Sequence, residues 1–259
     1  MALLLRVLRH ESLPGIVHCQ GATGNDFCTG IFPSGSDALV FLLRASHNVR
    51  YKEEAWQTMA FSDFTFPQVQ QDLGLVVDEA DLFSPVPPLP LREDFVTTLT
   101  DGATIALAVN TEKAKSEFII APVLLEVRRL CGGAVGLFSG VPLDVDPAKG
   151  LNGVCDFLLT KPARQFILST PVVVVVEAKN DNLRNGLGQC IATTYAATLY
   201  NQRAGSPSAA VCGVVTTGSA WKFLRLEGPT VTLDLKEYYI DNLGKLVGVL
   251  MHAVQNHNA

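Results

Sequence analysis

A run of five valines near the middle of the chain, Val172 to Val176, ends in Glu177, Ala178 and Lys179. A short, β-branched apolar run is typical of a central strand that is buried on both faces. Residues two apart on a strand share a face, so we expect Glu177 and Lys179 to point the same way and Ala178 to point oppositely. A buried acid and base cost free energy unless their charges are compensated. A metal ion for the carboxylate and an anionic substrate for the ammonium would compensate them, which indicates phosphodiester chemistry.

Asp156 and Gln189 are expected to join this pair. Asp156 lies in a second strand-like segment, and on the strand beside Glu177 it would give two carboxylates on one sheet face. Such oxygen ligands suit Mg²⁺ or Mn²⁺, with waters and a substrate phosphate completing the coordination. The metal would lower the pKa of a bound water, and Lys179 would orient that water or stabilise the developing negative charge. Gln189, ten residues after Lys179, would hydrogen-bond a phosphate oxygen or the metal-bound water.

A third carboxylate ligand is expected from the helix that precedes the first strand. If this helix runs antiparallel to that strand, its N-terminal end lies nearest the site, which favours Glu112 or Glu117 over Glu126. Glu112 lies on the apolar face of the helix and Glu117 on the opposite side, so we prefer Glu112 as the metal ligand. Glu126 is better explained by an ion pair with Arg128 or Arg129.

Alternating helices and strands would position these residues. Hydrophobic periodicity predicts helices over 112–131, 187–202 and 241–255, and strands over 134–141, 154–160, 171–179, 209–217, 221–226 and 231–235. Short connections between the first three strands predict antiparallel neighbours, and the helix before the fourth predicts a parallel crossover. The expected fold class is α/β, with a mixed central sheet flanked by helices.

Three parts are predicted along the chain: an N-terminal extension, an appendage and the domain that holds the site, over residues 1–58, 59–110 and 111–259. The extension lacks sustained periodicity apart from a short strand expected at 40–43, and Met59 is interpreted as the natural start. The appendage is expected to hold a helical turn, an extended proline-rich segment and the start of a short helix, at residues 66–73, 84–90 and 94–99.

Composition limits the expected partners and location. The net charge is −5 and the sequence pI is about 5.5, whereas a nucleic-acid-binding protein usually has a basic face. A strong non-specific DNA-binding surface is therefore disfavoured, which leaves a local basic cleft or a partner that brings the DNA. Six widely spaced cysteines without a CxxC pair indicate buried free thiols in a reducing cytoplasm. No apolar run reaches the ~18 residues of a membrane span, so the protein is expected to be cytoplasmic.

The order of the site residues resembles a known nuclease motif. Asp156, then Glu177-Ala178-Lys179, then Gln189 in the following helix, is similar to the pattern of the PD-(D/E)xK nuclease superfamily. The resemblance implies a restriction-endonuclease-like fold with an αβββαβ core, dependence on Mg²⁺ and hydrolysis of DNA phosphodiester bonds.

Two longer segments extend this resemblance. The segment 111–124 is similar to the start of the nuclease domain in type I restriction motor subunits, which also points to Glu112. From Met59 onward the chain is similar to a family of small, uncharacterised bacterial proteins common in cyanobacteria, whose pattern is matched at 150–157 and 176–180. The position that precedes the aspartate is Cys155, where the superfamily motif has proline.

The same residues are also compatible with other functions. The acidic balance and the lack of a DNA-reading domain favour, as a second hypothesis, a catalytically silent nuclease-fold protein that acts as a binding or regulatory module. A hydrolase of small phosphate esters is disfavoured because no Gly-rich phosphate loop occurs. The apolar face of the last helix, between Leu243 and Met251, either packs on the core or forms a protein or homodimer contact. A second acid-x-Lys tripeptide, Asp234-Leu235-Lys236, is interpreted as a solvated face.

Overall fold

The structure, a computed structural model, describes residues 16–20, 27–31, 59–206 and 208–256. Contacts divide the chain into two compact units, Met1–Trp56 and Gln57–Ala259. In the first unit, β1 (Ile16–Gln20) and β2 (Phe27–Ile31) pair in antiparallel fashion. The strand expected at 40–43 lies outside the described residues. The boundaries at residues 58 and 110, and Met59 as the start, stay predictions.

In the described part of the second unit, seven strands form one mixed sheet in the order β3-β9-β8-β7-β6-β5-β4. The strands are β3 (Val76–Ala80), β4 (Gly136–Pro142), β5 (Val154–Thr160), β6 (Val172–Ala178), β7 (Ala210–Thr216), β8 (Ala220–Glu227) and β9 (Thr230–Tyr239). Strands β4, β5 and β6 are antiparallel neighbours, and β6 runs parallel to β7 across a helical crossover. The predicted mixed α/β sheet and these strand directions are confirmed.

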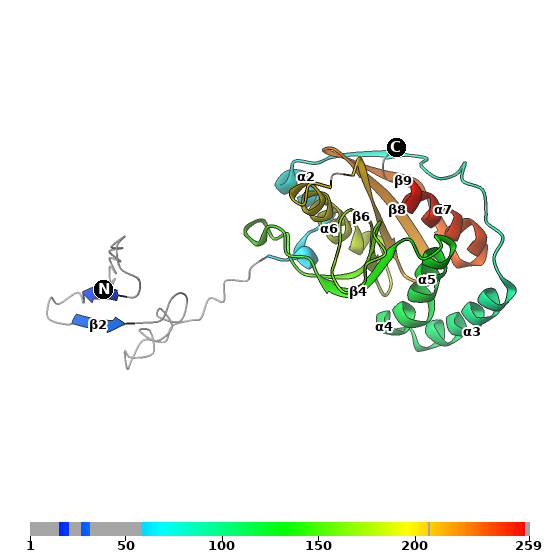
Figure 1. Ribbon diagram of the computed structural model, residues 1–259, viewed down its shortest axis with the longest axis horizontal. Helices are drawn as coiled ribbons and strands as arrows, with labels where there is room; N and C mark the ends of the chain where they lie inside the picture. The colour runs from blue at the N-terminus through cyan, green and yellow to red at the C-terminus, as the bar shows by residue number, and fades with distance from the viewer. Residues whose placement is uncertain (1–15, 21–26, 32–58, 207, 257–259) are drawn as a thin grey trace. The chain divides into compact units, whose positions relative to one another are not determined.

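Helices cover both faces of the sheet (Figure 1). On one side α3, α5 and α7 contribute to one hydrophobic cluster, and on the other α2 and α6 contribute to a second. The α-helices are α2 (Phe66–Leu73), α3 (Glu93–Val109), α4 (Glu112–Lys115), α5 (Ala121–Leu130), α6 (Leu183–Arg203) and α7 (Leu243–Gln255). Short turns of helix are η1 (Phe61–Asp63), η2 (Ser116–Ile120), η3 (Pro147–Lys149) and η4 (Ile240–Asn242). None of the described helices is long and apolar enough to cross a membrane.

Strand β6 is the middle of the core. All its seven residues are buried, and its side chains contribute to both hydrophobic clusters. Val174, Val176 and Ala178 pack toward α5 and α7, whereas Val175 packs toward α6. Full burial of a valine side chain contributes about 1.5–3 kcal/mol, which explains why this run forms the central strand. The predicted orientation of Ala178, opposite to its two charged neighbours, is consistent with this packing.

The helix predicted over 112–131 contains a π-helical segment. Thr111 caps α4 by accepting a hydrogen bond from the Ala114 amide at 3.1 Å. The π-helix η2 separates α4 from α5, and Pro122 lies in the first turn of α5. A proline at 122 has no amide hydrogen for the carbonyl of Phe118, which accounts for the irregular turn at this point.

Three expectations outside the site need correction or extension. Strand β3 was not predicted, because Val76 at this sheet edge is 59% exposed and the segment lacks an apolar face. Helix α3 runs for 17 residues rather than as a short helix. Asp234 is not solvated: it is 1% exposed and accepts a hydrogen bond from the Tyr238 hydroxyl at 2.9 Å.

Two further expectations are settled by burial. Helix α7 packs on the core, since Leu246, Val247 and Leu250 are buried there. Among the described cysteines, Cys155, Cys190 and Cys212 are buried free thiols, as predicted, whereas Cys131 is a free thiol that is only partly buried.

Candidate active site

Three of the predicted site residues meet at the end of β6. Glu177 is 2% exposed, and Lys179 is partly buried one residue beyond the strand. The Lys179 ammonium donates to Glu177 Oε1 at 2.8 Å and to Gln189 Oε1 at 2.9 Å. Gln189 reaches this point from α6, the crossover helix that follows β6. The shared face of Glu177 and Lys179, and the approach of Gln189, are therefore present as predicted.

Asp156 lies beside this group on β5. The antiparallel ladder pairs Phe157 with Val176, so the next step of the same register sets Asp156 opposite Glu177. Asp156 Oδ2 accepts a hydrogen bond from the Ala178 amide at 2.7 Å. This hydrogen bond joins β5 to the end of β6 and fixes the Asp156 carboxylate next to Glu177.

Negative charge exceeds positive charge around Glu177. Burial raises the pKa of Glu177 to about 8, with further increases from Asp156 and Glu112, while Lys179 opposes the shift. Burial alone would lower the pKa of Lys179, but its contact with Glu177 and the charges of Glu112 and Asp156 raise it instead. Three carboxyl groups thus act on one ammonium, an arrangement that favours an added cation.

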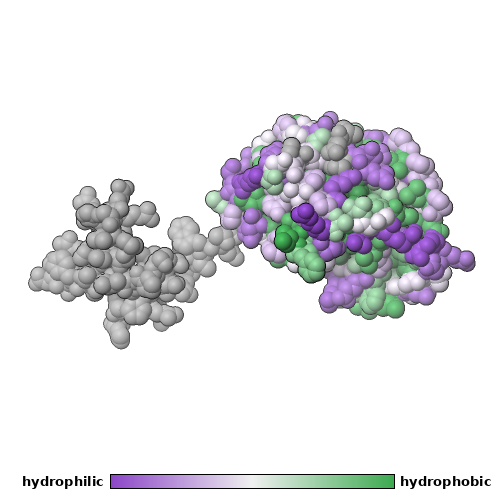
Figure 2. Space-filling model, in the orientation of Figure 1, coloured by the Kyte–Doolittle hydropathy of each residue, from purple (hydrophilic) through white to green (hydrophobic). Residues whose placement is uncertain are grey.

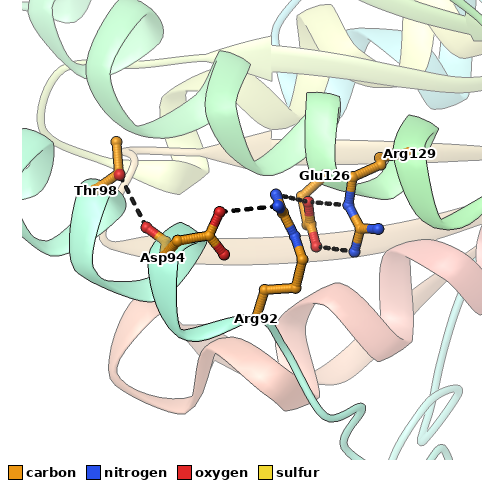
Figure 3. A network of polar contacts seen from close by, with 5 residues as sticks. All are labelled: Arg92, Asp94, Thr98, Glu126 and Arg129. Atoms are coloured by element: carbon orange, nitrogen blue, oxygen red, sulfur yellow. Dashed lines mark hydrogen bonds and ion pairs between the residues drawn. The ribbon is translucent and has the colours of Figure 1, made fainter.

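The helix carboxylates differ in their partners. Glu112, exposed in the first turn of α4, is the one whose charge acts on both Glu177 and Lys179. Glu117 pairs with Lys113 at 2.5 Å on the surface. Glu126 accepts hydrogen bonds from Arg129 at 2.7 and 2.6 Å (Figure 3), as the alternative reading of this residue predicted. Glu112 is therefore the helix carboxylate that remains a candidate for the site.

The carboxylates fit a hydrated divalent ion rather than a closed protein cage. Among the described residues, no three His, Cys, Asp or Glu side chains are grouped closely enough to enclose a metal ion. Mg²⁺ commonly takes one or two carboxylates and completes its shell with waters and phosphate oxygens. Asp156 and Glu177 on adjacent strands suit that mode, with Glu112 at the periphery. Whether a metal binds stays a prediction.

Glycines allow α6 to approach the site. A Cβ added at Gly186 would lie 3.0 Å from Lys179 Cγ and 2.6 Å from Val215 Cγ1. A Cβ at Gly188 would lie 2.3 Å from the carbonyl oxygen of Phe64. Helix α6 starts at Leu183, four residues before its predicted start, after Asn182 caps it by accepting from the Arg184 amide. Both glycines therefore lie inside the helix, where they make room for Lys179 and for the segment before α2.

Lys115 is a neighbour of the site that the sequence did not reveal. It is 5% exposed, and its ammonium donates to the Asn180 carbonyl oxygen at 2.6 Å and to Asn180 Oδ1 at 3.1 Å. Asn180 directly follows Lys179. The available signal was weak: Lys115 is three residues after Glu112, hence on the same side of the helix.

No family model and no curated protein matches this chain. A solved structure described as a "cryoEM structure DrdV-DNA complex" is similar over 63% of this chain, with 12% sequence identity and a TM-score of 0.37. This chain spans 14% of the length of that one.

Proposed function

We propose that this protein is a Mg²⁺- or Mn²⁺-dependent deoxyribonuclease that hydrolyses phosphodiester bonds at the end of β6. The observation that carries the proposal is the convergence of Asp156, Glu177, Lys179 and Gln189 from two strands and one helix. Adjacent carboxylates can hold a metal ion, and an ammonium and an amide can stabilise developing negative charge, which suits metal-assisted phosphodiester hydrolysis.

Each residue has a distinct role in this proposal. Asp156 and Glu177 hold the metal, which when bound lowers the pKa of a water and stabilises charge on the phosphoryl group. Lys179 has three donors, and two are already used, so the third is available for the attacking water or a phosphate oxygen. Gln189 accepts from Lys179 through Oε1, which leaves its NH₂ group to donate to a phosphate oxygen.

DNA is the proposed substrate, but the net charge of the protein does not favour DNA binding. The net charge of −5 opposes association with a polyanion. On the face shown in Figure 2, hydrophilic and hydrophobic residues are interspersed among the coloured residues. A partner protein or a homodimer is the proposed means of bringing DNA to the site.

A cleavage assay tests the proposal. Purified protein with supercoiled or single-stranded DNA and Mg²⁺ or Mn²⁺ is expected to cut. Lys179→Ala or Asp156→Ala is expected to lower the rate at least ~100-fold, because the first removes an ammonium that stabilises the transition state and the second removes a proposed metal ligand. Lys113→Ala, which changes an exposed lysine paired with Glu117, is the matched control and should keep full activity. Equal cleavage by wild type and both site variants would show that these residues are not the active site.

A catalytically silent binding module is the second candidate. The observation in its favour is that Lys179 already pairs with Glu177 at 2.8 Å, so the two charges compensate each other without a metal. Titration calorimetry with Mn²⁺ separates the candidates: no binding by the intact protein favours the silent module, and binding that Asp156→Ala abolishes favours the nuclease.

A further inference from the structure

Lys115 has an unusual environment for a lysine. Its side chain is 95% removed from solvent, given its exposed fraction of 5%. In the described part of the chain, no carboxylate forms an ion pair with it, and its polar contacts are the two oxygens of Asn180. A buried ammonium with neutral partners costs free energy relative to an exposed one. An uncharged side chain of similar length would fill the space at lower cost, so the two hydrogen bonds are the feature that needs explanation.

The two hydrogen bonds from Lys115 hold the segment that follows β6. The Lys179 amide donates to the Thr216 carbonyl of β7 at 2.8 Å. The Lys115 ammonium donates to the carbonyl oxygen of Asn180, the residue after Lys179. The backbone of residues 179 and 180 is therefore anchored on both sides of the Cα atom from which the Lys179 side chain departs.

The β7–β8 turn packs against the same lysine. Gly218, at a φ of +82°, would place an added Cβ 3.3 Å from Lys115 Cβ. Its amide donates to Thr216 Oγ1 at 2.9 Å, and its carbonyl accepts from Trp221 Nε1 at 2.9 Å. The stem of Lys115 thus lies against a turn that is itself fixed by hydrogen bonds, so its ammonium has little freedom to leave Asn180.

A local irregularity of the helix sets the direction of Lys115. The π-helix η2 begins at Ser116, directly after Lys115. A π-turn inserts an extra residue and rotates the preceding helical segment relative to the following one. In α4, Lys115 contacts Asn180 at the end of β6, and the charge of Glu112, three residues earlier, acts on Glu177 and Lys179, while α5 keeps its apolar face on the core.

We propose that Lys115 is a positioning residue of the candidate active site, which locks the helix that carries Glu112 to the strand end that carries Glu177 and Lys179. The inference rests on the proposed function. Lys115 does not touch the reacting atoms; it fixes the distance between the peripheral carboxylate and the paired residues. A misplacement of about 1 Å from a remote change can cost on the order of 100-fold in rate.

Lys115→Met tests the proposal because it keeps length and removes the donors. We expect kcat for DNA cleavage to fall about 10–100-fold with KM changed less than about twofold. Mn²⁺ affinity measured by calorimetry should fall about tenfold, the size reported for residues that orient ligands. Lys115→Arg, which can still donate to Asn180, should recover most of both losses, whereas an effect on packing alone would not be rescued by this larger side chain.

Lys113→Met is the matched control, since it changes an exposed lysine of the same helix. If Lys115→Met does not unfold cooperatively, Asn180→Ala removes one of the two acceptors and should give an intermediate loss of kcat and Mn²⁺ affinity. Active wild type with Lys115→Met or Asn180→Ala equal to the control overturns this proposal and leaves the proposed function intact. Wild type that neither cleaves DNA nor binds Mn²⁺ overturns the proposed function, and this proposal with it.

Discussion

Glu177 is the residue of the candidate site whose burial opposes its ionisation most directly. It is 2% exposed, and burial together with the charges of Asp156 and Glu112 raises its pKa to about 8. Its unfolded value is near 4.5. Between these two values the folded protein keeps a proton that the unfolded chain has lost, so this carboxyl stabilises the fold at low pH and the contribution is lost as pH rises.

Glu177→Gln should remove this pH dependence. Wild type is expected to lose stability relative to the variant as pH rises from about 5 to 8, by roughly 2–4 kcal/mol, because charging a buried carboxylate is what the glutamine avoids. Urea unfolding at several pH values in this range measures the difference. Parallel pH profiles for the two proteins would show that Glu177 titrates normally. Added Mn²⁺ should reduce the difference in stability between wild type and Glu177→Gln, since a cation stabilises the charged form of Glu177.

The site residues could be predicted from sequence to the extent that their spacing is local. Glu177 and Lys179 follow from strand periodicity and Gln189 from the next helix, while Asp156 required the further inference that two strands are neighbours. Lys115 could not be found in this way, because its contact with Asn180 joins positions 65 residues apart. Hydrophobic periodicity reports which face of a helix is buried but does not identify a distant hydrogen-bond partner.

At the scale of elements, a polar network fastens α3 to α5. Arg92, which caps α3, bonds Asp94 at 2.8 Å and lies 3.6 Å from Glu126 (Figure 3). Arg129 donates two hydrogen bonds to Glu126, and this contact lowers the pKa of Glu126 against the opposing effect of burial. The network therefore holds the N-terminal end of one helix against the helix that continues from α4.

Glu126→Gln is expected to destabilise the protein by about 1–2 kcal/mol at pH 7, a value discounted because Arg129 is 45% exposed and partly screened. The carboxyl has a lowered pKa, so its contribution is present above about pH 4.5 and lost as pH falls below it. Urea unfolding should show the difference in stability between wild type and variant shrinking as pH falls below 4.5. Glu117→Gln, in an exposed pair, serves as the control and should cost less than about 0.5 kcal/mol; equal effects would contradict the role of the network.

The strands were predictable where buried apolar residues make up most of the segment. Strands β5 and β6 match their expected ranges closely for this reason, and helix α2 also matches its expected range. Helix α3 was foreseen only at its start, because Ile105, Leu107 and Val109 are about half exposed and break the expected pattern. Edge strand β3 is held by pairing with the distant β9 rather than by a buried face of its own.

At the scale of the whole molecule, both described hydrophobic clusters lie between Phe61 and Val254. A fragment of residues 59–259 is therefore expected to unfold cooperatively within about 2 °C of the corresponding transition in the full chain. Calorimetry checks this. A fragment that starts at residue 66 is the control, because it loses the buried Phe61 and Phe64 and should unfold at least ~5 °C lower. A comparable drop on removal of residues 1–58 would mean that they stabilise the second unit.

The position of β6 has a consequence for how the site can change over time. A strand with neighbours on both sides and a cluster on each face opens only when the sheet itself comes apart, so its amide hydrogens should be among the last to exchange. Glu177 therefore keeps its position for as long as the sheet stays folded. On the proposed function, the elements that would adapt to a substrate are those that meet the strand end: the turn after Lys179 and helices α4 and α6. Evolution could retune or silence this site by altering those elements while leaving the valine strand unchanged.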